Sequence, residues 1–341
     1  MNPQRILLSR TDRLGDVILS TPVATALKKK FPNAEIFFLA RPYAGEILRL
    51  HPHVDGIIAY DPDQPGKDLI ALLHRHRFDA VLALFPRPRL AWAFYRAGIP
   101  RRMGTGYRWY SALFTPRLYE HRKDGRRHEA EYNLQLLRLL GIDEAKVEFH
   151  YRFSRAQEEH LRVKLLEWGM GEKFAVLHPG SGGSARDWPP EYFAALAKYL
   201  AQEHRLQVVL TGTAQEKSLT QQMQKLLPIE PIDLAGRLSL IELAGVLRRA
   251  MLFAGNSSGP LHLAVMMGTP VLAFYPPIRA CRPERWGPYG QRAGVLMSQT
   301  EECYRCRKSH ECACPCMRAI SVAAAMRKAE EKLGARSLLI S

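Results

Sequence analysis

Long apolar runs are missing from this sequence. No stretch approaches the roughly 18–20 consecutive apolar residues that a helix needs to cross a bilayer, so we expect no membrane span. The first residues, MNPQRILLS, pass directly into a strand-like pattern and lack the basic start, apolar middle and small-residue cleavage site of a signal peptide. We therefore expect a cytoplasmic protein.

Acidic residues are also few. The chain has 49 Lys and Arg against 33 Asp and Glu, which gives a formal net charge of +16. Residues 86–127 hold eleven Lys or Arg against only Glu120 and Asp124, interleaved with the aromatic residues Trp92, Phe94, Tyr95, Tyr107, Trp109 and Tyr110. This stretch is either a solvated basic face or a groove for an acidic, partly apolar molecule. Helix-turn-helix, zinc-finger and RNA-binding signatures are absent, so nucleic acid is not the expected partner.

Cysteines are confined to the last part of the chain. Six occur, and five fall within fourteen residues: Cys303, Cys306, Cys312, Cys314 and Cys316. In a cytoplasmic protein such clustering argues against structural disulfides. The spacing admits a zinc site, although it is tighter than that of zinc-ribbon pairs, and buried thiols without metal are the alternative.

The 341 residues exceed one typical domain and suit two. Short apolar runs alternate with helical patterns, first near 5–9, 35–40, 56–60 and 80–85, and again from 174 to 275. This alternation predicts an α/β protein with two doubly wound, Rossmann-like halves facing a cleft. We expect domains at 1–155 and 156–320, and a last helix within 321–341 that packs back on the first domain. In such sheets ligands bind beyond the carboxyl ends of the strands.

The first polar loop is SRTDRLGDVILSTP, residues 9–22. Gly15 permits a tight turn, and Asp16 then lies at or near the start of a helix. Asp16 is either the N-cap of that helix, a position that Asp favours, or a general base that points into the cleft.

The second loop is HPGSGGSARDW, residues 178–188. Its glycines let the backbone approach a ligand, its serines offer hydroxyl donors, and Arg186 adds a positive charge. Backbone amides at a helix N-terminus together with a cation form an anion site suited to a diphosphate. The loop lacks the Lys-Ser/Thr ending of a P-loop.

Two further loops complete the pattern. In LTGTAQE, residues 210–216, Gly212 lets a flat group lie against the backbone and Glu216 could accept two ribose hydroxyls. In AGNSSGPLH, residues 254–262, the serines and Gly259 offer donors, and His262 is either a core histidine or a catalytic one. Asp61-Pro62-Asp63 matches the Asp-x-Asp pattern of metal-dependent glycosyltransferases, but it is read as an ordinary turn.

Together these motifs resemble glycosyltransferase family 9, the ADP-heptose:lipopolysaccharide heptosyltransferases. The resemblance rests on LGDVILSTP (14–22), HPGSGG with RDWPPEYF (178–193), LTGTAQE (210–216), DLAGRLSLIELAGVL (233–247), GNSSGPLHLAVMMGTP (255–270) and the late cysteines. It implies a GT-B fold, with the acceptor bound by the N-terminal domain and the nucleotide by the C-terminal domain.

The resemblance also implies roles for particular residues. Asp16 matches the catalytic base of the family, and Glu216 matches a ribose contact. The remaining donor-binding candidates are Ser181, Gly182, Arg186, Thr211, Gly212, Ser257, Ser258, Gly259 and His262. Ser257 is a departure, because the family usually has an Asp there that contacts the donor sugar, and this leaves the identity of the donor open.

The implied activity is an inverting transfer of heptose from ADP-heptose to the inner core of lipopolysaccharide, without a required metal. Arg13, Arg87, Arg89 and Arg101 are the candidates for binding the anionic, lipid-linked acceptor. We expect a monomer that associates peripherally with the cytoplasmic face of the inner membrane. The alternatives are a GT-B transferase with another nucleotide sugar, a nucleotide-sugar epimerase of the same fold, and a binding protein with a vestigial site.

Overall fold

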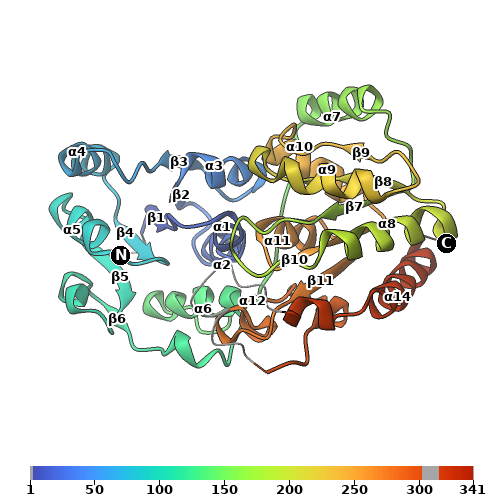
Figure 1. Ribbon diagram of the computed structural model, residues 1–341. Coiled ribbons are helices and arrows are strands. Elements are labelled where there is room, and N and C mark those ends of the chain that lie inside the picture. Colours follow the sequence, from blue (N-terminus) through green and yellow to red (C-terminus); the bar gives the residue numbers. More distant parts are fainter. Residues whose placement is uncertain (1–2, 302–314, 341) are drawn as a thin grey trace. The chain divides into compact units, whose positions relative to one another are not determined.

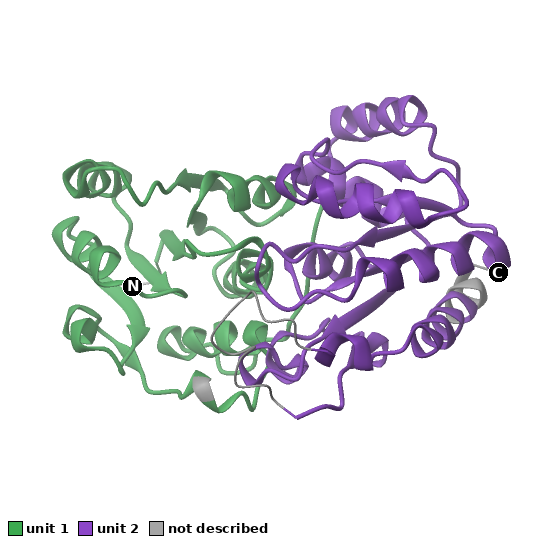
Figure 2. Cartoon of the chain, in the orientation of Figure 1, with its two compact units in different colours: residues 1–152 green, residues 153–341 purple. Residues whose placement is uncertain are grey.

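The computed structural model describes residues 3–301 and 315–340. The chain divides into two compact units, Met1–Arg152 and Phe153–Ser341, which Figure 2 colours green and purple. Each unit is an α/β fold built on its own sheet, as the alternation of strand and helix patterns predicts.

Unit 1 contains a six-stranded sheet in the order β3-β2-β1-β4-β5-β6, in which all neighbouring strands are parallel. The strands are β1 (Arg5–Ser9), β2 (Glu35–Ala40), β3 (Gly56–Ala59), β4 (Ala80–Ala83), β5 (Arg101–Thr105) and β6 (Arg117–Leu118) (Figure 1). Ile6, Leu7 and Leu8 are all fully buried although alternate residues of a strand point to opposite faces. Both faces of the sheet are therefore covered, as is usual for parallel sheets.

The helices of unit 1 follow the strands. They are α1 (Leu14–Ile18), α2 (Thr21–Lys30), α3 (Pro42–Gly45), α4 (Gly66–His76), α5 (Pro88–Arg96) and α6 (Glu129–Gln135), with 3-10 turns η1 (Glu46–Leu50), η2 (Trp109–Leu113), η3 (Arg122–Asp124) and η4 (Leu136–Leu140). Helix α6 continues directly into η4. Helix α5 was not expected from the sequence, and it buries Leu90, Ala91, Ala93 and Phe94.

Unit 2 repeats this topology. Its sheet has the order β12-β11-β10-β7-β8-β9. The strands are β7 (Phe174–His178), β8 (Gln207–Leu210), β9 (Ile232–Asp233), β10 (Leu252–Asn256), β11 (Val271–Tyr275) and β12 (Val295–Met297). Counted from its own first strand, each sheet has the order 3-2-1-4-5-6, which is that of the Rossmann fold.

The helices of unit 2 are α7 (Arg155–Glu167), α8 (Pro190–His204), α9 (Lys217–Leu226), α10 (Leu240–Arg249), α11 (Gly259–Met266), α12 (Pro283–Trp286) and α14 (Val322–Ile340). The 3-10 turns are η5 (Ala214–Glu216), η6 (Arg279–Cys281), η7 (Arg292–Gly294) and η8 (Pro315–Ala319). Helix α7 begins where the sequence places it, because Ser154 and Gln157 form a capping box. Among the described residues, no helix combines the length and the apolar character that spanning a membrane requires.

The last helix, α14, contributes Ala325, Ala329 and Leu333 to the hydrophobic core of unit 2. There it packs beside α8, β10 and β11. This differs from the expectation that the tail packs on the first domain. The apolar side of α14 has its partners within its own unit.

Candidate functional site

Each sheet has a switch point where the order of the strands reverses. In unit 1 it lies between β1 and β4, which pair up to Ser9 with Ala83. In unit 2 it lies between β7 and β10, which pair up to His178 with Gly255. Because ligands of doubly wound sheets bind beyond the carboxyl ends of the strands at such points, the loops after these strands are the candidate sites.

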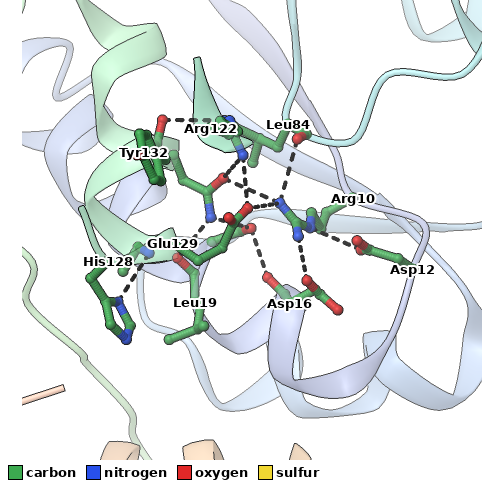
Figure 3. Close-up of polar contacts among 12 residues, drawn as sticks. Arg10, Asp12, Asp16, Leu19, Leu84, Arg122, His128, Glu129 and Tyr132 are labelled. Carbon is green, nitrogen blue, oxygen red and sulfur yellow. Dashed lines mark hydrogen bonds and ion pairs between the residues drawn. The ribbon is translucent and has the colours of Figure 1, made fainter. Parts of the chain in front are cut away.

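Asp16 lies in the first turn of α1, just beyond the loop that follows β1. The N-cap of this helix is Arg13, so the interpretation of Asp16 as an N-cap is wrong. The Asp16 carboxylate instead accepts a hydrogen bond from Arg10, with 2.5 Å between Oδ1 and Nη2 (Figure 3). The Asp16 side chain is still 17% exposed, so the carboxylate is held and yet accessible.

Arg10 is buried and joins three elements of unit 1 (Figure 3). Its other hydrogen bonds run from Nε to Asp12 Oδ1 at 2.8 Å, and from Nη1 to Glu129 Oε1 at 3.2 Å, to Asn133 Oδ1 at 3.2 Å and to the Leu84 carbonyl at 3.4 Å. Leu84 follows β4, whereas Glu129 and Asn133 lie one turn apart on α6. A single guanidinium group thus connects both sides of the switch point to a distant helix.

A second arginine shares two of these acceptors. Arg122 Nη1 donates to Glu129 Oε1 at 2.7 Å and to Asn133 Oδ1 at 3.1 Å. The amide of Asn133 in turn donates to the Leu19 carbonyl at 3.1 Å, at the end of α1. We call Arg10, Asp12, Asp16, Arg122, Glu129 and Asn133 the Arg10 network.

The Arg10 network holds three carboxylates and two guanidinium groups, and so carries one excess negative charge when all are ionised. Burial disfavours the charged form of Arg10, but Asp12, Asp16 and Glu129 outweigh it and raise the pKa of Arg10. Burial raises the pKa of Asp12, and Arg10 offsets only part of this shift. The Glu129 side chain is 2% exposed, so the accessible carboxylates of the network are those of Asp12 and Asp16.

Three of the four arginines expected to hold an acceptor lie at the carboxyl edge of the sheet in unit 1. Arg13 caps α1, and Arg87 caps α5 with its guanidinium 4.3 Å from the ring centre of Phe85. Arg89, in the first turn of α5, donates to the backbone carbonyls of Pro62 and Gln64. Arg101 begins β5 and therefore lies at the opposite edge, so the structure does not bring it together with Asp16.

The loop after β7 in unit 2 depends on glycine. Gly182 and Gly183 have φ angles of +56° and +70°, a region that other residues rarely adopt. The Ser181 hydroxyl donates to the Ala185 carbonyl at 3.1 Å and closes the turn. Arg186 follows, four residues before the start of α8 at Pro190. This loop has the backbone donors, the nearby cation and the helix N-terminus that favour an anion.

Glu216 joins this loop to the loop after β8. Its Oε1 accepts from the Gly182 N–H at 2.9 Å, and its Oε2 accepts from the Thr213 N–H at 2.8 Å. A Cβ atom on Gly180 would lie 2.0 Å from Oε1, so only glycine leaves room there. Burial opposes ionisation, but His178 and these N–H donors lower the pKa of Glu216. A carboxylate has further lone pairs that a ligand hydroxyl can use.

Thr211 and Gly212, the other two donor-binding candidates in the loop after β8, offer a ligand fewer side-chain groups than Glu216 does. Thr211 is buried, and its hydroxyl lies 3.0 Å from Nδ1 of His178. Burial lowers the pKa of His178, although Glu216 opposes this shift. Gly212 accepts a backbone hydrogen bond from Gly236 at 2.8 Å. Thr211 therefore stabilises the carboxyl end of β8. Gly212 has no side chain, so a ligand could lie against its backbone.

At the switch point of unit 2, the side chain of Asn256 bonds to the loop after β7. Its Nδ2 donates to the Pro179 carbonyl at 2.6 Å and to Asp187 Oδ1 at 3.2 Å. Its Oδ1 accepts from the Trp188 N–H at 2.9 Å. One fully buried amide at the end of β10 thus fixes the glycine-containing loop after β7.

Asp187 adds a buried acid to this loop. Burial raises its pKa to about 6, although the Ser181 side chain and the charge of Arg186 oppose this rise. Glu216 adds to the rise through its own charge. Asp187 therefore loses its negative charge, close to the proposed anion site, as the pH falls through about 6.

The loop after β10 leads into α11. Ser258 is the N-cap residue and Pro260 lies in the first turn. Ser257 hydrogen-bonds to Tyr275, whose own hydroxyl donates to a backbone carbonyl at 2.7 Å. Ser257, Ser258 and His262 are all buried. Gly259 opens the helix, so its N–H group belongs to the unsatisfied first turn.

Sequence reasoning missed Arg10, Glu129, Asn133, Asp187 and Asn256. A local signal existed for Arg10, since it lies just after the carboxyl end of a buried strand, where ligands of such sheets bind. Glu129 and Asn133 had a weaker signal, because they lie four residues apart and so fall on one face of a helix.

Of the five clustered cysteines, Cys303, Cys306, Cys312 and Cys314 lie outside the described residues. Cys316 is buried and Cys281 is partly buried. Within the described ranges, no group of three or more His, Cys, Asp and Glu could hold a metal ion.

Comparison with known proteins agrees with this geometry. Glycosyltransferase family 9 (heptosyltransferase) matches residues 67–317. A Haemophilus influenzae protein named "Putative glycosyltransferase" is 29% identical over 301 residues, covering 84% of this chain and 86% of that protein. Lipopolysaccharide heptosyltransferase 3 of Escherichia coli is 26% identical over 285 residues, covering 76% and 79%. The solved structure of E. coli ADP-heptose lps heptosyltransferase II superposes with a TM-score of 0.80 at 20% identity, covering 98% and 99%.

Two Rossmann-type units, each with polar loops at its switch point, agree with the GT-B fold of the solved heptosyltransferase structure. The family match spans well over half of the sequence and includes the loops after β7, β8 and β10. The chain belongs to glycosyltransferase family 9, the heptosyltransferase family.

Proposed function

We propose that this enzyme transfers heptose from ADP-heptose to the inner core of lipopolysaccharide, onto a lipid A–Kdo or heptosyl acceptor. The observation that carries the proposal is the Asp16 carboxylate, which Arg10 holds at 2.5 Å at the switch point of unit 1. The E. coli relatives named for this chemistry support the choice of donor and acceptor.

In the proposed reaction Asp16 takes the proton from an acceptor hydroxyl while that oxygen attacks the anomeric carbon of the donor. The new carbon–oxygen bond forms as the bond to the diphosphate breaks, and the electron pair leaves with ADP. Attack opposite to the leaving group inverts the anomeric configuration.

Unit 2 would bind the donor. Arg186, the amides near Ser181 and Gly182 and the N-terminus of α8 would stabilise the charge that develops on the leaving diphosphate. Glu216 would accept the ribose hydroxyls. Thr211, Gly212, Ser257, Ser258, Gly259 and His262 would form the rest of the donor site. No divalent metal is required by this scheme.

Unit 1 would bind the anionic acceptor. Arg13, Arg87 and Arg89 lie at the edge that carries Asp16, and they are suited to phosphates or carboxylates. Basic residues between Arg87 and Arg127 would also attract the enzyme to anionic lipid. We propose a monomer at the cytoplasmic face of the inner membrane.

The test is release of ADP from ADP-heptose in the presence of heptose-deficient lipopolysaccharide cores. Asp16→Asn should lower turnover at least a hundredfold if Asp16 is the general base. Asp143→Asn removes the same charge from an exposed site in unit 1 and should leave turnover unchanged. Near-normal turnover by Asp16→Asn would refute the role of this residue.

A different nucleotide sugar is the second candidate, favoured by one residue. Ser257 is neutral where the family usually has an Asp, and Tyr275 holds its side chain by a hydrogen bond. The same assay should therefore include UDP- and GDP-sugars. Turnover with one of these donors, and none with ADP-heptose, would keep the fold and the base but change the donor.

A further inference from the structure

Three aromatic side chains form a surface cluster in unit 1. The rings of Tyr107 and His121 stack, with centroids 4.0 Å apart and planes inclined by 24°. Tyr119 meets Tyr107 edge to face at 5.5 Å. Tyr107 is 44% exposed and Tyr119 is 62% exposed. We call Tyr107, Tyr119 and His121 the aromatic triad.

The backbone at Gly106 leaves room for the ring of Tyr119 in the aromatic triad. A Cβ atom on Gly106 would lie 2.3 Å from Cε1 of Tyr119, so the ring rests against bare backbone. The Gly106 N–H donates to the Leu118 carbonyl at 2.8 Å, which joins the ends of β5 and β6. The rings are therefore held in place, although large parts of them face solvent.

The triad lies at the same edge of the sheet as Asp16. Tyr107 follows the carboxyl end of β5, and Tyr119 and His121 follow that of β6. The strands run in the order β1-β4-β5-β6, and the register places Ser9 level with Ala83. Three strand spacings of about 4.8 Å separate β6 from β1, so the triad lies roughly 14 Å along this edge from the start of the Asp16 loop.

Arg122 links the triad to the Arg10 network. It directly follows His121 in the chain, and its guanidinium donates to Glu129 at 2.7 Å. The same Glu129 oxygen accepts from Arg10, which holds Asp16. The segment that carries His121 is thus anchored by the ion pairs that also position the proposed base.

We propose that the aromatic triad is a binding site for a sugar ring of the acceptor, at least one unit away from the hydroxyl that reacts. This inference rests on the proposed function, since it assumes a saccharide acceptor at the Asp16 edge. The nonpolar face of a sugar ring packs against an aromatic ring, while its hydroxyls stay in water or meet polar groups. The nearby arginines, Arg117 and Arg122, suit a saccharide with acidic substituents.

The distance of roughly 14 Å between the aromatic triad and the Asp16 loop indicates the size of the ligand. A group that reaches from Asp16 to the triad must be longer than a single sugar, so an oligosaccharide fits and a monosaccharide acceptor does not. Not every exposed aromatic residue of unit 1 follows the carboxyl end of a strand. Trp92 and Tyr95 on α5 are 50% and 49% exposed, but Tyr95 contacts Arg102, which lies near the amino end of β5. Trp92 and Tyr95 therefore serve as a control: they are exposed aromatic residues that do not lie at the edge that carries Asp16.

The experiment measures binding and turnover of deacylated core oligosaccharides, shortened by one distal sugar at a time. Tyr107→Ala, Tyr119→Ala and His121→Ala should each raise the KM for the longer acceptors by roughly three- to tenfold, and leave the shortest acceptor and the KM for the donor unchanged. Tyr107→Phe should restore the wild-type KM, because it keeps the ring face. Gly106→Ala should mimic Tyr119→Ala by displacing that ring. Trp92→Ala and Tyr95→Ala should match wild type.

Titration of the oligosaccharides without donor separates this inference from the proposed function. If wild type binds them and the triad variants bind equally well, the inference fails and the proposed function stands. If wild type binds none of them, the proposed acceptor class fails together with the triad. Equal weakening for every acceptor length would also overturn the inference. So would a defect seen only with acylated acceptor in vesicles, which would assign the triad to the membrane.

Discussion

Arg10→Met provides the most demanding test of the site in unit 1. Methionine fills a similar volume but removes every donor from the centre of the Arg10 network. Asp12 and Asp16 lose the guanidinium that pairs them, and Glu129 keeps its ion pair with Arg122. The remaining three carboxylates then share one positive charge.

The structure sets the size of the effect. Breaking a buried ion pair by removal of one partner costs about 3–5 kcal/mol, and Arg10 is both buried and multiply bonded. We expect a loss of stability of that order. A misplaced general base loses most of its contribution, which is about 10²–10⁴-fold. Turnover should therefore fall about a hundredfold or more, whereas ADP binding to unit 2 should not change.

Two measurements separate these effects. Chemical denaturation reports stability, and ADP release at saturating donor reports turnover, with calorimetry of ADP binding as the control for unit 2. Arg10→Lys should recover part of the turnover, because one ammonium group can reach only some of the acceptors. Arg122→Met is the matched variant, since it removes the other guanidinium from Glu129 and leaves the Arg10–Asp16 pair intact. If Arg10→Met turns over as fast as Arg122→Met, the positioning of Asp16 by Arg10 is refuted.

Two further predictions concern pH. The pKa of Asp187 is raised to about 6 by burial, so its carboxylate is ionised at pH 7.5 and loses that charge as the pH falls through 6. Asp187→Asn should then bind ADP several-fold more tightly than wild type at pH 7.5 and equally at pH 5, and a constant ratio in calorimetry would contradict this. Burial lowers the pKa of His51 from 6.5 to about 3, so the unfolded chain binds its proton first and stability falls as the pH drops from 6.5 towards 3. His51→Gln should reduce the stability lost between pH 7 and pH 5 by about 2 kcal/mol in denaturant titrations, since His53 and His150 remain in both proteins.

The central strands β1 and β7 could be predicted because their residues are buried on both faces. Their cores, ILL and FAVL, are continuous apolar runs, since helices cover both sides of each sheet. Strand β6 has two residues and lies at a sheet edge, so it leaves no such run. Its place in the sheet depends on pairing with β5, which local sequence does not encode.

Helix α5 was missed for a different reason. PRLAWAFYR lies in the basic stretch and mixes aromatic residues with arginines, which indicated a surface segment. Its buried residues, Leu90, Ala91, Ala93 and Phe94, nevertheless follow the spacing of one helix face. Two of its three aromatic residues, Trp92 and Tyr95, are exposed, and they obscure the helical period.

The glycine loops could be predicted because their chemistry is local. A positive φ at Gly182 and Gly183 and the close approach of Glu216 to Gly180 require residues with no side chain. The Arg10 network could not be predicted, because its contacts join residues 119 and 123 positions apart. Only the fold brings the end of β1 beside α6.

The two switch points have the same strand topology, but the polar side chain that lies at each of them differs. In unit 1 a charged guanidinium occupies the point and bonds to carboxylates, including Asp16. In unit 2 a neutral amide, that of Asn256, bonds to backbone groups and to Asp187. Carboxylates thus lie at both points, but in unit 2 the glycine turn, Arg186 and the N-terminus of α8 add groups that suit a phosphate. We infer from this contrast that unit 2 receives the nucleotide, while Asp16 in unit 1 removes a proton from the acceptor.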